Sequence, residues 1–178
     1  MKKSGFLLLV ISIVLFSCKK SHDTTTNNGG GNDLNKWTFK QGSTTYSGGL
    51  LFESALLNTT LQSNNTYSLS MIGPDSKNPN MFNLILSLAD TTFTVKNYQS
   101  GNPAVDLLNG FYYFEVNNNA DNIYKSADLD PGQIMNYTIT SYDPVKDVVT
   151  ITFSGKAVDK DGNEVSITDG KVIAKIDR

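Results

Sequence analysis

A two-residue alternation of apolar and polar side chains runs through much of the sequence after Trp37 and restricts the fold more than any other feature. In segments 66–71, 92–96 and 149–154 every second residue is apolar, and most of the residues between them are threonine or serine. Successive side chains of a strand point to opposite faces, so this pattern predicts strands with one face in a core and one in solvent. No stretch of about 11 residues or more has the apolar spacing of an amphipathic helix. The sequence therefore predicts an all-β domain.

Residues that favour turns divide these strands at short intervals. Asp143-Pro144, Asp161-Gly162 and Asp169-Gly170 each stand between two strand-like segments, and glycine and aspartate are common where a turn needs a positive φ. About nine to ten short strands separated by turns favour an antiparallel β-sandwich. An up-and-down, lipocalin-like barrel is the alternative. Segments 81–89 and 111–116 are apolar on both faces, which is typical of central, covered strands.

Residues 1–18 follow the plan of a secretory signal. Lys2 and Lys3 precede an almost unbroken apolar run over 6–16, and the small residue Ser17 stands just before Cys18, the only cysteine. A transmembrane helix needs about 20 apolar residues, so the run is too short to span a membrane and is predicted to be removed.

Leu-Phe-Ser-Cys at 15–18 resembles the lipobox of bacterial lipoproteins, in which the cysteine is acylated and becomes the first residue of the mature protein. Phe16 departs from the small residue that is usual there. The resemblance implies a signal peptide at 1–17 and lipidation of Cys18, with palmitate among the expected acyl chains. It also implies contact with a membrane through this lipid.

A polar segment separates this signal from the alternating region. Residues 19–32 include no apolar side chain and are rich in threonine, asparagine and glycine, so they cannot bury surface and are predicted to form a flexible linker. We therefore expect a tether at 18–33 and a single β-sandwich domain at 34–178.

The positions of histidine and cysteine exclude several kinds of catalysis. His22, the only histidine, lies in the tether, and Cys18 lies in the lipobox. A serine or cysteine nucleophile would lack its base within the domain, and zinc would lack its preferred ligands. We expect no catalytic residue, no metal and no cofactor, and therefore a protein that is not an enzyme.

Acidic residues leave two weaker possibilities. Asp159, Asp161 and Asn163 begin like a calcium loop, but Glu164 stands where that loop needs glycine, so a plain turn is favoured. A hydrolase assisted by carboxylates is the least favoured function, because no spacing brings two of the available glutamates together. The glutamates considered are Glu53, Glu115 and Glu164.

Aromatic residues offer the best indication of a ligand. Tyr112 and Phe114 lie in a run of four aromatic residues, and Tyr124 and Trp37 are candidates to extend it. Aromatic faces with polar rims bind sugars and apolar compounds, whereas the competing interpretation is that all four side chains fill the core. The candidate ligands are a carbohydrate or a small apolar compound, and another envelope protein is a candidate partner.

The charge of the chain excludes other partners. The formal net charge is −2, which provides no field that would attract nucleic acid or anionic lipid headgroups. We expect a monomer that contacts the membrane through its lipid.

The ends of the domain resemble a group of Bacteroidota lipoproteins of unknown function. The matching residues are strand and turn motifs, namely 37–39, 46–48, 137–143, 149–157 and 167–172, with Gly162 between the last two. The resemblance implies an all-β, lipid-anchored protein and carries over no catalytic residue. In this phylum acidic residues after the cysteine resemble a surface-export signal, and only Asp23 is acidic here. We therefore expect an outer-membrane lipoprotein, with the periplasmic face favoured over the cell surface, that acts as a non-enzymatic binding or structural module of the envelope.

Overall fold

The computed structural model describes residues 33–60, 66–99, 109–116, 121–127 and 134–178. The chain divides into two compact units, Met1–Gly31 and Asn32–Arg178, and every described residue belongs to the second. The predicted signal peptide, Cys18 and nearly all of the tether lie outside the described residues. Within the described ranges, no helix has the length and apolar character needed to cross a membrane.

Eleven strands and one short 3-10 turn make up the described part of the domain. In chain order they are β1 (Lys36–Gln41), β2 (Thr44–Gly49), η1 (Leu51–Glu53), β3 (Ala55–Asn58), β4 (Tyr67–Pro74), β5 (Asn80–Leu88), β6 (Asn97–Gln99), β7 (Gly110–Glu115), β8 (Asn122–Ala127), β9 (Met135–Asp143), β10 (Val148–Asp159) and β11 (Glu164–Asp177). The all-β prediction is confirmed. The structure has slightly more strands than the nine to ten expected, and two of its strands, β3 and β6, are short.

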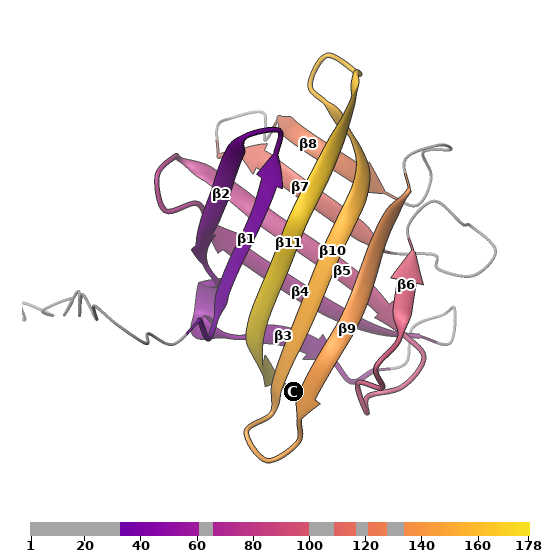
Figure 1. Ribbon diagram of the computed structural model, residues 1–178. Coiled ribbons are helices and arrows are strands. Elements are labelled where there is room, and N and C mark those ends of the chain that lie inside the picture. Colours follow the sequence, from indigo (N-terminus) through magenta and orange to yellow (C-terminus); the bar gives the residue numbers. More distant parts are fainter. Residues whose placement is uncertain (1–32, 61–65, 100–108, 117–120, 128–133) are drawn as a thin grey trace, which may run out of the picture. The chain divides into compact units, whose positions relative to one another are not determined.

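The strands form two layers that cross each other (Figure 1). One layer contains β2, β1, β11, β10, β9 and β6 in that order, and the other contains β3, β4, β5, β7 and β8. Short pairings join the layers at their edges: β11 pairs with β3 in parallel at Ile176 and Asp177, and β10 pairs with β8 at Val158 and Asp159. The arrangement is a sandwich with hydrogen-bonded corners, and all its named pairings except β11–β3 are antiparallel.

Aromatic side chains from both layers fill the space between them. Trp37 of β1 stacks on Phe82 of β5 with ring centroids 4.7 Å apart. Phe111 of β7 lies 5.2 Å from Phe39 and 5.6 Å from Phe153 of β10. All five residues are buried. Because burial of each such ring removes a large apolar area from water, this cluster is the main hydrophobic contact between the layers.

The predicted turn at Asp169-Gly170 is wrong, because both residues lie within the long strand β11. The pairing between β10 and β11 shifts from Phe153↔Gly170 to Gly155↔Ile167, and Asp169 has a φ of 52°. This is a β-bulge, in which one strand carries an extra residue. A Cβ atom at Gly170 would lie 2.4 Å from both Cδ2 and the carbonyl oxygen of Phe153, so glycine is required for this close approach.

The strand predicted from the alternation over 92–96 is also wrong, because the structure has no strand there. Phe93 is buried but has a φ of 53°, and the carboxylate of Asp90 accepts a hydrogen bond from the backbone N–H of Thr92 at 2.8 Å. This local side-chain-to-backbone bond stabilises a bend. The hydrogen bond from the Thr92 hydroxyl to the same carboxylate, together with the backbone bond, lowers the pKa of Asp90. The strand β6 begins only at Asn97.

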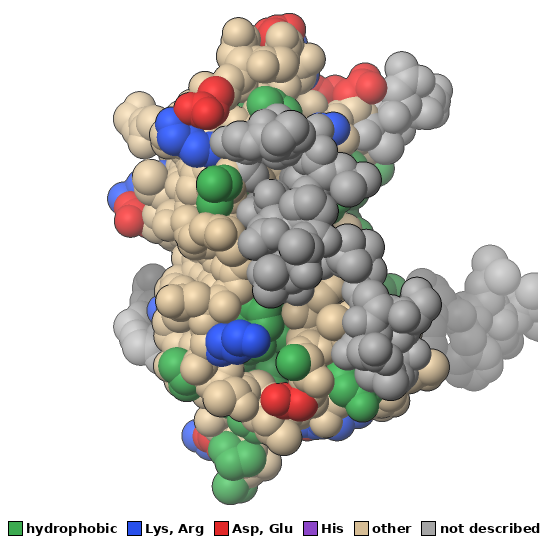
Figure 2. Space-filling view, turned by 90° about the vertical axis from the view of Figure 1, so that its right-hand side faces the viewer, with side chains coloured by type: hydrophobic (Ala, Val, Ile, Leu, Met, Phe, Trp, Pro, Cys, Tyr) green, Lys and Arg blue, Asp and Glu red, His purple; other side chains and the backbone are tan. Residues whose placement is uncertain are grey.

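Exposed hydrophobic side chains are scattered over the described surface. Phe52 is 76% exposed in η1 and Val145 is 93% exposed between β9 and β10. On the face shown in Figure 2, the hydrophobic side chains of described residues form separate spots among uncharged polar surface and charges of both signs. Isolated exposed apolar residues are ordinary on soluble surfaces and do not by themselves mark a site.

Candidate functional site

The sheet separates the four aromatic residues that the sequence indicated. Trp37 and Tyr124 face the space between the layers, where Trp37 is only 1% exposed and Tyr124 lies 6.0 Å from Tyr113. Tyr112 and Phe114 face outward from β7 and are half-buried. The structure therefore assigns Trp37 to the core, places Tyr124 at the edge of the core cluster, and leaves Tyr112 and Phe114 as surface candidates.

Tyr112 and Phe114 line a shallow depression of about 310 Å³ on the outer face of β5, β7 and β8. The other lining residues are Asn83, Ile85 and Asn122. Asn83 pairs directly with Tyr112 across the sheet, and Asn122 pairs with Phe114. The second apolar face predicted for the segments around β5 and β7 is thus a partly exposed aromatic surface flanked by amides.

Asn83 carries an unpaired polar atom beside this surface. Its Oδ1 atom is buried and accepts no hydrogen bond among the described residues. A buried acceptor without a partner costs about 1–3 kcal/mol, so a ligand that supplied a donor would gain this amount in part. Because this oxygen is itself buried, a ligand in the depression reaches it only if the Asn83 side chain turns outward.

Gly110 fixes the position of the Tyr112 ring. A Cβ atom at Gly110 would lie 2.6 Å from Cε2 and 3.1 Å from the hydroxyl oxygen of Tyr112. The distal part of the ring therefore occupies the space that a side chain at position 110 would need. Because Gly110 has no Cβ, the Tyr112 ring lies over its own strand, and the position of the ring determines the shape of the depression.

A second group of tyrosines lies between the layers. The hydroxyl oxygens of Tyr46 and Tyr124 are 3.1 Å apart, and the Tyr113 hydroxyl donates to Asp75 at 2.8 Å while it accepts from Asn80 at 2.9 Å. Burial raises the pKa of Tyr113 and Tyr124 far above the ordinary value, and the hydrogen bond to Asp75 adds to this for Tyr113. Both phenols stay protonated at neutral pH, so this group is structural.

Asp75 is the buried polar residue that the sequence did not reveal. Only 8% of it is exposed, and its Oδ1 atom accepts backbone hydrogen bonds from Lys77 at 2.7 Å and from Asn78 at 3.0 Å. Asp75 follows Gly73 and Pro74, residues that favour turns. The sequence contained no sign that the same carboxylate also binds Tyr113, which is 38 residues away.

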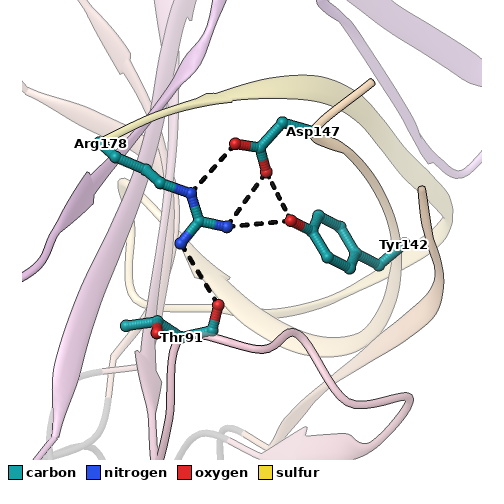
Figure 3. A network of polar contacts seen from close by, with 4 residues as sticks. All are labelled: Thr91, Tyr142, Asp147 and Arg178. Carbon is teal, nitrogen blue, oxygen red and sulfur yellow. Dashed lines mark hydrogen bonds and ion pairs between the residues drawn. The ribbon is translucent and has the colours of Figure 1, made fainter. Parts of the chain in front are cut away.

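A network of polar contacts surrounds Arg178 (Figure 3). Its guanidinium binds both carboxylate oxygens of Asp147, at 3.0 and 3.1 Å, and its Nη2 atom also donates to Tyr142 at 2.9 Å. Tyr142 in turn donates to Asp147 at 2.6 Å, and Nη1 of Arg178 reaches the carbonyl oxygen of Thr91 at 3.5 Å. The Tyr142 hydroxyl thus already donates one hydrogen bond and accepts another, so the network joins three segments and offers no free nucleophile or base.

The remaining acidic candidates lie on separate elements. Glu53 is in η1, Glu115 is at the end of β7, and Glu164 forms an ion pair with Lys156 at the start of β11. At the β10–β11 tip, Asp159 accepts backbone hydrogen bonds from Asp161 and Asn163 at 3.0 and 2.8 Å, so the predicted turn is confirmed. Among the described residues, no group of three or more acidic, histidine or cysteine side chains is arranged to hold a metal ion.

No protein-family model matches this chain, and comparison with curated proteins and with solved structures gives no match.

Proposed function

We propose that the protein is a lipid-anchored, non-enzymatic module of the bacterial cell envelope that binds its ligand on an outer surface of the sandwich. The lipobox-like sequence that ends at Cys18 supports the anchor. The resemblance of both ends of the domain to Bacteroidota lipoproteins supports an outer-membrane location, with the periplasmic face favoured. The observation that carries the binding role is the aromatic depression at Tyr112 and Phe114.

The core argues for an outer surface over an interior cavity. The inward-facing ring of Trp37 lies 5.9 Å from that of Phe39 and 4.7 Å from that of Phe82, measured between centroids. An apolar ligand between the layers at this point would therefore have to displace packed side chains. Displacing well-packed groups from a core costs several kcal/mol. The role of small-ligand carrier is therefore less well supported than surface binding.

The anchor is tested by mass spectrometry of the N-terminal peptide from the native host. We expect the mature chain to begin at Cys18 with a thioether-linked diacylglycerol, since two acyl chains are needed for stable membrane attachment. The Cys18→Ala variant should keep residues 1–17 and should not appear as the mature, acylated form. A mature wild-type chain with a free Cys18 thiol would contradict the anchor.

Carbohydrate is the ligand class that the depression favours. Aromatic rings pack against the C–H faces of sugars, and amides such as Asn83 and Asn122 donate to and accept from hydroxyl groups. The Oδ1 atom of Asn83 would add an acceptor once its side chain turns outward. The depression is too shallow and too polar at its rim to enclose a large apolar compound.

A glycan array probed with the full chain tests this function. Tyr112→Ala and Phe114→Ala should each weaken binding to the glycans that the wild type retains, and Gly110→Ala should weaken it by displacing the Tyr112 ring. Phe52→Ala removes an exposed ring from η1, at a distance in sequence from this surface, and serves as the matched control. Retained binding by the Tyr112→Ala and Phe114→Ala variants, with unchanged thermal stability, would exclude this surface as the site.

A further inference from the structure

A row of polar side chains crosses six strands on the outer face of the other layer. The residues are aligned by the strand pairings, so that each lies beside the next. In spatial order they are Ser47, Thr38, Lys171, Thr152, Thr138 and Asn97. Their chain neighbours Trp37, Val172 and Ile151 are buried, so the row itself faces solvent.

Two depressions on this face meet at Lys171. One has a volume of about 560 Å³ and extends over β2, β1 and β11, from Asp33 and Ser76 to Lys171. The other, of about 390 Å³, extends over β11, β10 and β9 and shares Lys171 with the first. In Figure 1 no described element lies over this layer. Six strands spaced by about 4.8 Å make the row about 24 Å long.

The charges along this face are unevenly paired. Lys40 forms an ion pair with Asp169 at 2.9 Å. Lys36 and Lys171, which line the same depression, have no carboxylate within 4.0 Å among the described residues. Asp33 stands at the far end of that depression. Two exposed ammonium groups without a carboxylate partner among the described residues therefore lie on this face, in a protein whose net charge is −2.

The hydroxyl groups along the row differ in whether they have a hydrogen-bond partner among the described residues. Thr38 donates to the carbonyl oxygen of Tyr46 at 3.0 Å, and Thr138 donates to Asn97 at 2.8 Å. The side chains of Ser47 and Thr152 have no hydrogen-bond partner in the part of the chain that the structure describes. A hydroxyl both donates and accepts, so these two can bind a polar ligand on either side of Lys171.

We propose that this face binds an acidic polysaccharide, with carboxylate groups of the chain at Lys36 and Lys171 and sugar hydroxyls at Ser47 and Thr152. The row is long and narrow, which suits an extended polymer. It contains no large apolar residue of the kind that anchors a protein partner or inserts into a membrane. The site lies on the opposite layer from Tyr112, so it does not depend on the carbohydrate site proposed above.

Titration calorimetry with the full chain in detergent tests the proposal, with oligogalacturonate as the acidic probe and a neutral glucose oligomer of equal length as its control. We expect the acidic oligomer to bind with an affinity that falls as salt is added, because exposed charge pairs are screened. Lys171→Gln and Lys36→Gln should each weaken binding about 1.5- to fivefold, the range of exposed ion pairs. Thr152→Val should also weaken it, while it keeps the shape of the side chain.

Lys160→Gln removes one positive charge from the tip of the β10–β11 hairpin and is the matched control. Equal effects of Lys160→Gln and Lys171→Gln, or no binding of the acidic oligomer, would overturn the proposal. Vesicles of phosphatidylglycerol test the other anionic surface in the envelope. The proposal would also be overturned if the protein bound these vesicles in a Lys171-dependent way and did not bind oligogalacturonate. A loss of oligogalacturonate binding in Tyr112→Ala as large as that in Lys171→Gln would place the oligomer at the aromatic depression and would overturn the proposal.

Discussion

The guanidinium group of Arg178 binds the carboxylate of Asp147 in a bidentate arrangement, from Nε to Oδ2 at 3.0 Å and from Nη2 to Oδ1 at 3.1 Å. The backbone of Asp147 takes part as well, because its carbonyl oxygen accepts a hydrogen bond from Ile176 at 2.7 Å. The ring of Phe93 lies beneath the guanidinium, 5.7 Å from it, and against Tyr142. This cluster ties the end of β11 to the β9–β10 hairpin and to the segment after β5.

Loss of this ion pair should destabilise the domain. Asp147→Asn keeps the side-chain shape and tolerates the φ of 56° at this position, but removes the charge that Arg178 and Tyr142 share. We expect a loss of about 1–2 kcal/mol in the free energy of unfolding, at the upper end for a partly exposed bidentate pair. Lys146→Gln breaks the more exposed pair with Asp143, at 3.7 Å, and should change stability by less than about 0.5 kcal/mol. Urea unfolding compares the two, and equal effects would contradict a specific role for Asp147.

The same pair should make stability depend on acid. Hydrogen bonds from Arg178 lower the pKa of Asp147, so in the interval below the ordinary carboxyl pKa the unfolded chain binds more protons than the folded one. The stabilisation is therefore present above about pH 4 and is lost as the pH falls through the lowered pKa. Urea midpoints of the wild type and of Asp147→Asn should converge as the pH is lowered. A difference that stays constant down to about pH 2 would count against this linkage.

The close contact at Gly170 should make this glycine intolerant of substitution. Gly170→Ala would place its Cβ 2.4 Å from the ring and carbonyl of Phe153, which must then move within the core. Overpacking of this kind costs about 1–3 kcal/mol. Gly49→Ala is the control, because its Cβ would meet nothing closer than 3.8 Å. Thermal unfolding should show a large loss for the first variant and little change for the second.

The hydroxyl of Tyr113 should contribute to stability through Asp75. Tyr113→Phe leaves the buried carboxylate of Asp75 and the amide of Asn80 without this partner, and removal of one partner of a buried pair costs about 1–3 kcal/mol. Tyr46→Phe breaks only the 3.1 Å contact with Tyr124 and should cost less. Chemical denaturation measures both variants, and a larger effect at Tyr46 would argue against the role given to Asp75.

Burial of these phenols also predicts behaviour in alkali. The pKa values of Tyr113 and Tyr124 are raised in the folded state. Their contribution to the free energy of unfolding is therefore present below the ordinary tyrosine pKa of about 10 and is lost as the pH rises beyond it. Ultraviolet titration should show that these two tyrosines ionise only together with unfolding. Ionisation of every tyrosine near pH 10 in a folded domain would contradict their burial.

The sequence was sufficient for most of the strands but not for the assignment of their faces. Alternation identified the strands around Leu69 and Ile151, because one face of each is polar. It could not decide which face of the run at 111–114 points inward, because all four residues are aromatic. The split between Tyr112 on the surface and Tyr124 at the core cluster follows from pairing with β5 and β10, which is tertiary information.

Contacts between distant residues were also beyond the sequence. The turn chemistry of Asp143-Pro144 indicated the hairpin that holds Asp147, but its partner Arg178 lies 31 residues further along the chain. Glycine and aspartate at 169–170 had the composition of a turn, and only the pairing of β11 with two neighbours shows that they form a bulge. The polar row through Lys171 depends on the same pairings and had no signal within any single strand.

The bulge at Asp169 changes which residues of β11 belong to the interior. Before it the buried position is the odd-numbered Ile167, and after it the buried positions are the even-numbered Gly170, Val172, Ala174 and Ile176. The bulge thus shifts the alternation of side chains by one residue, so that both halves of the strand keep their apolar side chains in the core. Deletion of Asp169 alone would leave Ile167, Gly170 and Val172 at alternating positions, so it should remove the bulge while the aliphatic half of the strand keeps facing the core.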